Sequence, residues 1–318
     1  MGQASLLLSA GALFFTAITA VSIPPGFHTV AGAASVPIPP GFSRIIFEDD
    51  FSKQPAGSQP STAKWSYSVG TSYPGGPANW GTKEIQSYSS SRENLVITSG
   101  ALAITPLNNG GRWTSARIES TPAHDIACAA GGKLRIEASL KFGKAPPSEQ
   151  MGIWPSFWAI GSGFRGNTDR WPAVGELDVA ESINGQPTTW QMLHCGWTPG
   201  GPCNEFNGIG GPVPFTRGEF HTVAVEVDRT NGGDWRGERL LWYIDGRLTS
   251  SVDGTRVNDE GAWTAVTRNP KFLILNVAVG GDFPNNVAND GRVLTPTPET
   301  KGGPDSAMEV RYIAVFST

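Results

Sequence analysis

Charged residues are scarce in this chain of 318 residues, and none of them gathers into a basic run. They make up 16% of the sequence, with a formal net charge of −4, so we expect no nucleic-acid partner. No helical repeat of apolar residues is sustained anywhere, which argues against a helical domain. Beyond the first 22 residues no apolar run is long enough to cross a bilayer, so no membrane span is expected.

Cysteine is rare as well, with three residues in the chain. Cys195 and Cys203 bracket a loop rich in Gly and Pro, and in a secreted chain we expect them to form a disulfide that fixes this loop. Cys128 is then left over, and we interpret it as a buried thiol. The spacing of the cysteines does not suggest a zinc site. No N-x-Ser/Thr sequon is present, so N-glycosylation is not expected.

The N-terminus predicts secretion. Leu6 to Val21 is apolar and ends in small residues, which fits a signal peptide over residues 1–22, although the usual positive n-region is missing. Residues 23–42 are rich in Pro, Gly and Ala and contain Ile-Pro-Pro-Gly-Phe twice, so we interpret them as an extended spacer. We therefore expect an extracellular monomer whose single folded domain covers residues 43–318.

Glycine, proline and tryptophan are abundant, at 40, 25 and 11 residues, and together with repeated strand patterns they favour an all-β domain. Residues 133–142 alternate strictly, which predicts a strand with one buried face and one polar face. Residues 272–279 are apolar apart from Asn276, which predicts a strand buried on both faces. Residues 309–316 are a plausible closing strand.

Two hairpins are indicated by turns that contain glycine. Residues 95–98 and 101–105 flank Ser99-Gly100, and the run 240–244 leads into Asp245-Gly246. Short strands joined in this way are typical of two packed antiparallel sheets, which is the fold class that we expect.

The stretch 174–182 carries three acids among β-forming apolar residues. In a strand Glu176 and Asp178 point to one side, while Leu177 points to the core on the other. Glu181 is five residues from Glu176, so a regular strand would bury its carboxylate, at a high cost. A one-residue β-bulge near Val179-Ala180 would return Glu181 to the side of the other two acids.

Like charges on one side of a strand raise the pKa of at least one of them. Glycoside hydrolysis uses two carboxyl groups, one as an acid and the other as a nucleophile or base, and it needs their pKa values to differ. The three acids of this stretch could provide such a pair. If the side chains of Glu176 and Glu181 lean together, their carboxyl groups can approach the ~5–5.5 Å of a retaining enzyme. The alternative is a solvated acidic strand face, and the pattern does not say which glutamate has which role.

Several further motifs accompany this stretch in a fixed order. They are Asn79-Trp80-Gly81 with Glu84, Thr114-Ser115-Ala116-Arg117, Gly152-Ile153-Trp154-Pro155-Ser156-Phe157-Trp158, Trp171-Pro172-Ala173 before the acids, Leu193-His194-Cys195, Trp242-Tyr243-Ile244-Asp245-Gly246 and Leu275-Asn276-Val277-Ala278-Val279-Gly280-Gly281. From residue 47 to residue 316 the chain resembles glycoside hydrolase family 16, in particular laminarinase-like endo-1,3(4)-β-glucanases of the fungal secreted type.

The resemblance implies a jelly-roll β-sandwich, of the concanavalin A-like type, with a concave face for a β-glucan chain. It implies that Glu176 is the nucleophile, Glu181 the general acid/base, and Asp178 the residue that tunes the nucleophile. No cofactor is expected.

Six further residues are candidates for substrate binding. Asn79, Arg117, Trp171 and His194 are candidates by resemblance, and Trp154 and Trp158 are candidates because they are aromatic residues of the matching motif. Flat aromatic faces suit sugar rings, and Trp154 and Trp158, four residues apart, share one side of a strand. The alternatives are core packing for each Trp, a satisfied structural histidine, an ion pair for Arg117 and a turn for Asn79. Pro155 predicts an edge strand or a bend.

One departure from the family concerns calcium. Many members bind a structural calcium through an acid in the last strand, where this chain reads Met308-Glu309-Val310-Arg311-Tyr312. Arg311 stands in place of the acid, and calcium needs oxygen ligands, so we expect no metal here.

The leading hypothesis is a secreted retaining endo-glucanase that acts on β-1,3 or mixed β-1,3/1,4 glucan. A transglycosylase that passes the glycosyl group to another sugar is a second hypothesis, and hydration of the site would decide between them. A non-catalytic glucan-binding lectin is a third, and the presence of both glutamates argues against it. The sequence leaves open whether the preferred polymer is β-1,3-glucan, mixed-linkage glucan or a galactan.

Overall fold

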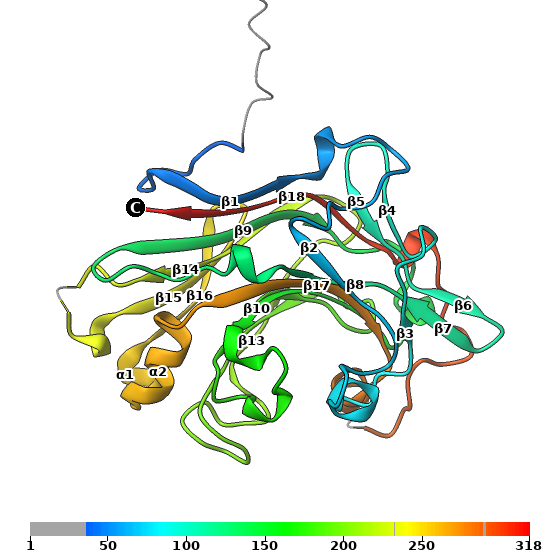
Figure 1. The fold of residues 1–318 in the computed structure, drawn as a ribbon. Coiled ribbons are helices and arrows are strands. Elements are labelled where there is room, and N and C mark those ends of the chain that lie inside the picture. The colour runs from blue at the N-terminus through cyan, green and yellow to red at the C-terminus, as the bar shows by residue number, and fades with distance from the viewer. Residues whose placement is uncertain (1–35, 232, 289–290) are drawn as a thin grey trace, which may run out of the picture. The chain divides into compact units, whose positions relative to one another are not determined.

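A computed structural model describes residues 36–231, 233–288 and 291–318 of the chain. The predicted signal peptide and the first part of the predicted spacer lie outside the described residues. Within them, strands form two large antiparallel sheets, seen above and below one another in Figure 1. The structure therefore has the predicted β-sandwich fold, and residues 36–42, the end of the predicted spacer, lead into its first strand.

One sheet has eight strands and the other seven. From edge to edge, the first contains β16 (Arg247–Asp253), β15 (Arg239–Ile244), β14 (His221–Asp228), β9 (Lys133–Lys141), β18 (Met308–Ser317), β5 (Leu102–Ile104) and β4 (Leu95–Ile97), with β1 (Arg44–Asp50) also paired to β18. The second contains β13 (Ile209–Pro214), β12 (Thr188–His194), β11 (Glu176–Glu181), β10 (Ile153–Gly161), β17 (Lys271–Val279), β8 (Arg117–Ser120) and β2 (Trp65–Ser68).

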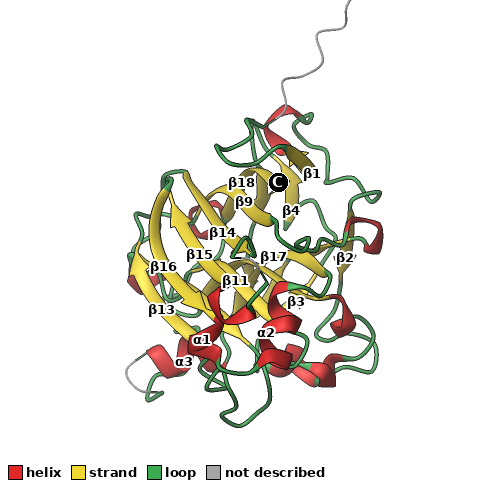
Figure 2. Ribbon diagram, turned by 90° about the vertical axis from the view of Figure 1, so that its left-hand side faces the viewer, coloured by secondary structure: helices red, strands yellow, loops and turns green. Residues whose placement is uncertain are grey.

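Smaller elements complete the unit. A short sheet contains β3 (Ser87–Tyr88), β7 (Arg112–Ser115) and β6 (Leu107–Asn109), and the α-helices are α1 (Gly254–Val257), α2 (Glu260–Thr267) and α3 (Asp282–Val287). Figure 2 shows all three helices in the lower part of the view, away from β1, and α1 lies beside α2. Among the described residues, these helices are too short to cross a membrane.

The two sheets meet in one apolar core. Val225 and Ile313 of the eight-stranded sheet are fully buried in the same cluster as Leu177 and Leu275 of the seven-stranded sheet. At about 25 cal/mol per Å² of apolar surface, such burial is the main term that stabilises a sandwich. The seven-stranded sheet therefore has one face fixed by the core, and its other face carries the polar residues of β11.

The predicted turns and strands are confirmed. Asp245 and Gly246 join β15 and β16 with φ angles of 49° and 74°, the left-handed conformation that a two-residue hairpin turn requires. Strands β4 and β5 pair across Ser99-Gly100, and every residue of β17 is buried, as the apolar run predicted. Cys195 and Cys203 form the predicted disulfide, and Cys128 is a buried free thiol.

The polar face of β9 differs from its prediction because it is buried as well. Arg135 lies 2.6 Å from the carboxylate of Glu137 and 2.7 Å from that of Glu226 on β14, and the three side chains are nearly inaccessible. Tyr312 on β18 donates a hydrogen bond to Glu137. Alternation in β9 identified which residues are polar, but pairing with a charge on β14 and a hydroxyl on β18 allows them to be buried.

The expectation of an edge strand at Pro155 is wrong, because β10 lies between β11 and β17 in the middle of its sheet. The alternative, a bend at Pro155, stays a prediction. The carbonyl of Pro155 accepts a hydrogen bond from the backbone of Ser182, one residue beyond the end of β11. In an antiparallel sheet the N–H and the C=O of one residue point to the same neighbouring strand. The position where Pro155 lacks an N–H is therefore on the side of β11, just beyond the last residue of that strand. A central strand accommodates proline there with little loss of pairing.

The predicted β-bulge in β11 is confirmed. Asp178 and Glu181 are opposite Met192 and Trp190 of β12, so three steps on β11 match two on its neighbour. The register with β10 shifts at the same place. The backbone carbonyl of Asp178 accepts a hydrogen bond of 2.9 Å from the indole of Trp242, which reaches across the core from β15. The opposite sheet thereby provides a partner for a carbonyl at the irregularity.

We predict that Trp242→Phe lowers the free energy of unfolding by about 1–3 kcal/mol through the unpaired buried carbonyl, in addition to the loss of ring volume. Trp113→Phe is the matched control, since Trp113 belongs to the same core and its indole donates no hydrogen bond within the described residues. Urea unfolding measures both. Equal losses in the two variants would contradict a role for the hydrogen bond.

The calcium expectation concerns β18. Arg311 lies 3.8 Å from the ring centroid of Phe220, and Glu309 is paired with Lys141 at 2.8 Å. This surface presents cations where a calcium ion would need several oxygen ligands. A calcium ion bound to the native state would raise the melting temperature, and a chelator would remove that gain. Because we expect no bound calcium, we predict that adding a chelator changes the melting temperature by less than about 1 °C. A fall of several degrees that calcium reverses would contradict this prediction.

Candidate active site

The three acids of β11 lie on the side of the strand away from the core. Leu177 and Val179 are fully buried in the core between the sheets, and the bulge turns Glu181 back toward Glu176 and Asp178. In Figure 1 the loops around residues 162–175 and 78–81 project from this same side of the seven-stranded sheet. The acids therefore stand on a rigid strand and are surrounded by loops.

Glu176 is half-buried, and the indole of Trp171 donates a hydrogen bond of 3.1 Å to its Oε2. Burial raises the pKa of Glu176 to about 7, and the neighbouring charge of Glu181 also raises it. The charge of His194 and the hydrogen bond from Trp171 act in the opposite direction. Glu176 therefore exchanges its proton near neutral pH, where an exposed glutamate is fully ionised.

Glu181 is buried beside two donors on β10. The indole of Trp154 and the hydroxyl of Ser156 donate hydrogen bonds of 2.9 and 3.0 Å to its Oε1. Burial raises the pKa of Glu181, and these two hydrogen bonds lower it, with a net upward shift. A carboxyl group with a raised pKa can retain a proton to deliver to a leaving group.

Asp178 lies between the two glutamates and is buried. Its Oδ2 has no hydrogen-bond partner within the described residues, although the Nε2 atom of His194 is 3.4 Å away. Burial first, and then the charges of Glu181 and Glu176, raise the pKa of Asp178 well above its usual range. A proton on Asp178 removes one of three neighbouring negative charges, which is how such a cluster is tolerated.

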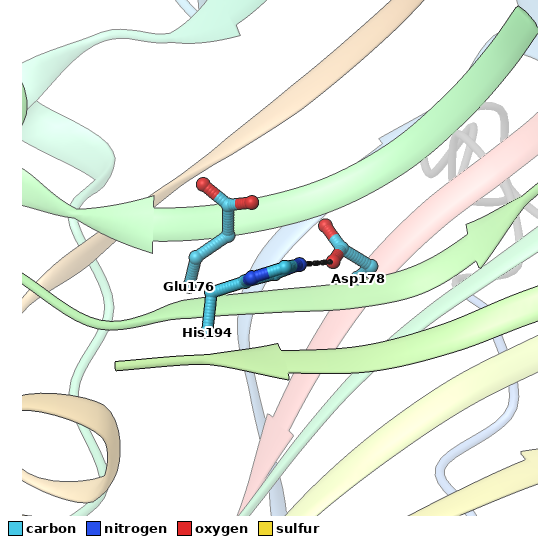
Figure 3. A group of neighbouring side chains, drawn as sticks. All are labelled: Glu176, Asp178 and His194. Atoms are coloured by element: carbon cyan, nitrogen blue, oxygen red, sulfur yellow. Dashed lines mark ion pairs between the residues drawn. The ribbon is translucent and has the colours of Figure 1, made fainter. Parts of the chain in front are cut away.

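His194 comes from β12, directly opposite Glu176. Figure 3 shows its ring beside Glu176 and Asp178, with Nε2 directed toward Asp178. Its Nδ1 makes a hydrogen bond of 2.8 Å with Glu205. Burial lowers the pKa of His194, but the hydrogen bond to Glu205 and the charges of Glu176 and Glu181 outweigh it, so the pKa is raised. The imidazolium form is favoured among these carboxyl groups.

Comparison with known proteins gives the context of this geometry. An endo-1,3-β-glucanase from Streptomyces sioyaensis is 42% identical in sequence, and its structure superposes with a TM-score of 0.81 over 90% of this chain and 99% of its own. The chain belongs to glycoside hydrolase family 16. No family model matched the sequence.

Two curated relatives of this family-16 chain are more distant. A glucan endo-1,3-β-glucosidase A1 from Niallia circulans is 28% identical over 86% of this chain, and a β-glucanase from Rhodothermus marinus is 29% identical over 74% of it. The matched regions cover 37% and 76% of the lengths of those two proteins.

The three predicted tryptophans gather on the acid-bearing side of the family-16 sheet. Trp154 and Trp158 are half-buried, while Phe157 between them is in the core, so the two share the side of the acids as predicted. The indole of Trp158 donates to Asn276 on β17. Trp171 stacks with Phe206, with ring centroids 6.1 Å apart and planes at 23°. Phe206 is 69% exposed, and sequence reasoning did not identify it.

Arg117 and Asn79 lie further from the acids in chain order. Arg117 is buried, with its Nε 2.9 Å from the carboxylate of Glu119, and its guanidinium lies 4.9 Å from the ring centroids of both Trp80 and Trp158. Such cation–π contacts hold the aromatic rings in place. Asn79 is exposed in a turn, with φ at 53°. A direct contact of either residue with substrate stays a prediction.

Glu205 is a second residue that sequence reasoning missed. Its carboxylate accepts hydrogen bonds of 2.8 Å from His194 and from the backbone N–H of Cys195. The available signal was its position just beyond the loop bounded by Cys195 and Cys203, next to the predicted histidine.

A cation is the alternative occupant of this cluster. Glu176, Asp178 and His194 each place one potential ligand atom within 4.8 Å of the other two. A metal would need a neutral imidazole, whereas the surrounding carboxylates favour protonated His194. An imidazolium at this place supplies a positive charge itself, and a role of the group in acid–base chemistry stays a prediction.

We predict that Trp171→Phe raises the pKa of Glu176 above its value of about 7, because the variant keeps an aromatic ring but loses the N–H donor that lowers this pKa. Titration of ¹³C-labelled glutamate by NMR, with Glu176 assigned by a Glu176→Gln spectrum, measures the change. Phe206→Ala is the control, since it removes the stacked ring and leaves the donor. A lower pKa of Glu176 in Trp171→Phe would refute the assignment.

Proposed function

We propose that the protein is a retaining endo-glycosidase that hydrolyses internal bonds of β-1,3 or mixed-linkage β-1,3/1,4 glucan. The observation that carries this proposal is the bulged strand β11, which turns Glu176 and Glu181 to one side, each with an indole N–H on its carboxylate. Membership of family 16 and a likeness to a protein described as an endo-1,3-β-glucanase support it.

In the first step a carboxylate oxygen of Glu176 attacks the anomeric carbon and forms an ester bond to the sugar. The bond between the anomeric carbon and the bridging oxygen breaks, and Glu181 gives its proton to that oxygen. Trp171 supports this role of Glu176 because its N–H orients the carboxylate. The donors Trp154 and Ser156 hold the same oxygen of Glu181, which leaves its other oxygen to carry the proton.

In the second step Glu181, now ionised, takes a proton from a water molecule, and the resulting nucleophile attacks the anomeric carbon. The ester bond to Glu176 breaks and the carboxylate is restored. Two inversions give net retention of configuration. Asp178, placed between the two glutamates, holds or releases a proton as their charges change, which is our proposal for its role.

The substrate class follows from the surroundings of the acids. Exposed or half-buried aromatic rings, from Trp154 to Phe206, suit the flat apolar faces of sugar rings, and Arg117 beside them is paired with Glu119. We further propose that the protein is secreted and acts as a monomer outside the cell, and the disulfide supports an oxidising compartment.

A panel of polymers tests the substrate class. Reducing-sugar release is measured on laminarin, curdlan, lichenan, galactan and cellulose. We expect release of short oligosaccharides from laminarin or lichenan, with a fall in polymer length early in the reaction, since cleavage is internal. Activity on galactan alone, or binding of laminarin without cleavage, would reject the proposed function.

The two glutamates can be distinguished by the sugar azide that each variant forms. Glu181→Ala should hydrolyse glucan about 10²–10⁴-fold more slowly, the usual contribution of a general acid. With a leaving group that needs no protonation it should still form the glycosyl-enzyme, and azide should release a β-glycosyl azide after two inversions. Glu176→Ala should give the α-azide by a single inversion.

Asp178→Asn is the matched control, because it should lower the rate without changing the stereochemistry of the product. NMR of the anomeric proton identifies each azide. Exchange of the two anomers between the glutamate variants would mean that the roles of Glu176 and Glu181 are reversed.

A further inference from the structure

The carboxylate of Glu205 is fully buried, yet it lies next to an active site that already contains three acids. Both of its oxygens have partners: Oε1 accepts from the N–H of Cys195 and Oε2 from Nδ1 of His194, each at 2.8 Å. A buried carboxylate is stable only with good donors or an opposite charge. Protonated His194 provides both.

The bond to Glu205 determines which atom of His194 faces the acids. With Nδ1 held by Glu205, Nε2 is directed toward the unpartnered Oδ2 of Asp178 at 3.4 Å (Figure 3). An imidazole oriented by a carboxylate on one nitrogen presents a defined atom on the other, as in catalytic triads and metal sites. Glu205, His194 and Asp178 thus form a continuous chain from the loop to β11.

The loop that carries Glu205 is tied closely to His194. The disulfide joins Cys195, the residue after His194, to Cys203, two residues before Glu205. On the other side, a Cβ atom at Gly208 would lie 2.8 Å from Cε1 of His194, and its φ of +75° disfavours any other residue. The ring of His194 is therefore held between Glu205 and Gly208, next to the loop that the disulfide closes.

We infer that Glu205 is a positioning residue, which keeps His194 protonated with Nε2–H toward Asp178, so that one positive charge stands among the reacting carboxyl groups. This inference rests on the proposed function for its effect on rate, but its structural part can be measured without any substrate. The charged groups that face His194 are Glu176, Asp178 and Glu181 of β11 and Glu205 itself.

The sign of the effect on Glu176 follows from two opposed changes in Glu205→Gln. The variant loses a negative charge that raises the pKa of Glu176, and it also lets His194 lose the proton whose charge lowers that pKa. His194 has the larger influence on Glu176 of the two. The net change is therefore a higher pKa of Glu176 and an acid limb of kcat/KM at higher pH.

The first measurement uses the unaltered protein. The ¹⁵N shifts of the His194 ring, recorded against pH, should show both nitrogens protonated at pH 7. A neutral ring at that pH overturns the inference, whether or not any variant folds.

The second measurement compares Glu205→Gln with Glu205→Asp and Gly208→Ala. Glu205→Gln should lower the pKa of His194, move the acid limb of kcat/KM for laminarin to higher pH, and lower kcat about tenfold with KM little changed. Glu205→Asp keeps the negative charge, so it should restore part of the position of the acid limb and part of kcat. Gly208→Ala displaces the ring of His194 without changing any charge. It should therefore lower kcat, with a smaller shift of the acid limb than Glu205→Gln produces.

If Glu205→Gln lowers only the melting temperature, and His194 titrates as in the unaltered protein, Glu205 is merely structural and the inference is wrong. If the unaltered protein cleaves no glucan, the proposed function fails, while the titration of His194 still decides whether Glu205 holds its proton.

Discussion

Repulsion among three carboxyl groups on one side of a single strand is the constraint to which the rest of the site responds. Burial strengthens that repulsion, and the surroundings offset it with donors rather than with lysine or arginine. Trp171 serves Glu176, Trp154 and Ser156 serve Glu181, and His194 stands beside Asp178. Indole and imidazole groups also present flat faces, so the groups that stabilise the acids can also contact a sugar ring.

The sandwich gives this strand a fixed position. One side of β11 is locked into the core by Leu177 and Val179, and Trp242 crosses from the opposite sheet to satisfy the carbonyl of Asp178. Side chains on the other side therefore have a backbone that cannot yield when their charges change. A site held on a loop would relax under the same repulsion and lose the raised pKa values that acid–base chemistry uses.

Much of this arrangement could be predicted because its signals are local in the sequence. The alternation in β11, its bulge, the Asp245-Gly246 turn and the pairing of Cys195 with Cys203 each depend on a few consecutive residues. What could not be predicted depends on partners far along the chain. Arg135 is buried because Glu226 pairs with it, and β10 is a central strand although it contains Pro155. Glu205 has a place in the site only because its loop folds back onto His194.

The bulge in β11 has a consequence for how the length of this strand can vary. Removing one residue, Val179, would leave Glu176, Asp178 and Glu181 at alternate positions of a regular strand, still on one side. Removing a residue between Glu176 and Asp178 would instead turn one of the acids into the core. The strand is thus tolerant of a length change at one point and intolerant of it two residues away. A shortened version could keep its acids opposite the same residues of β12, with one apolar side chain fewer in the core.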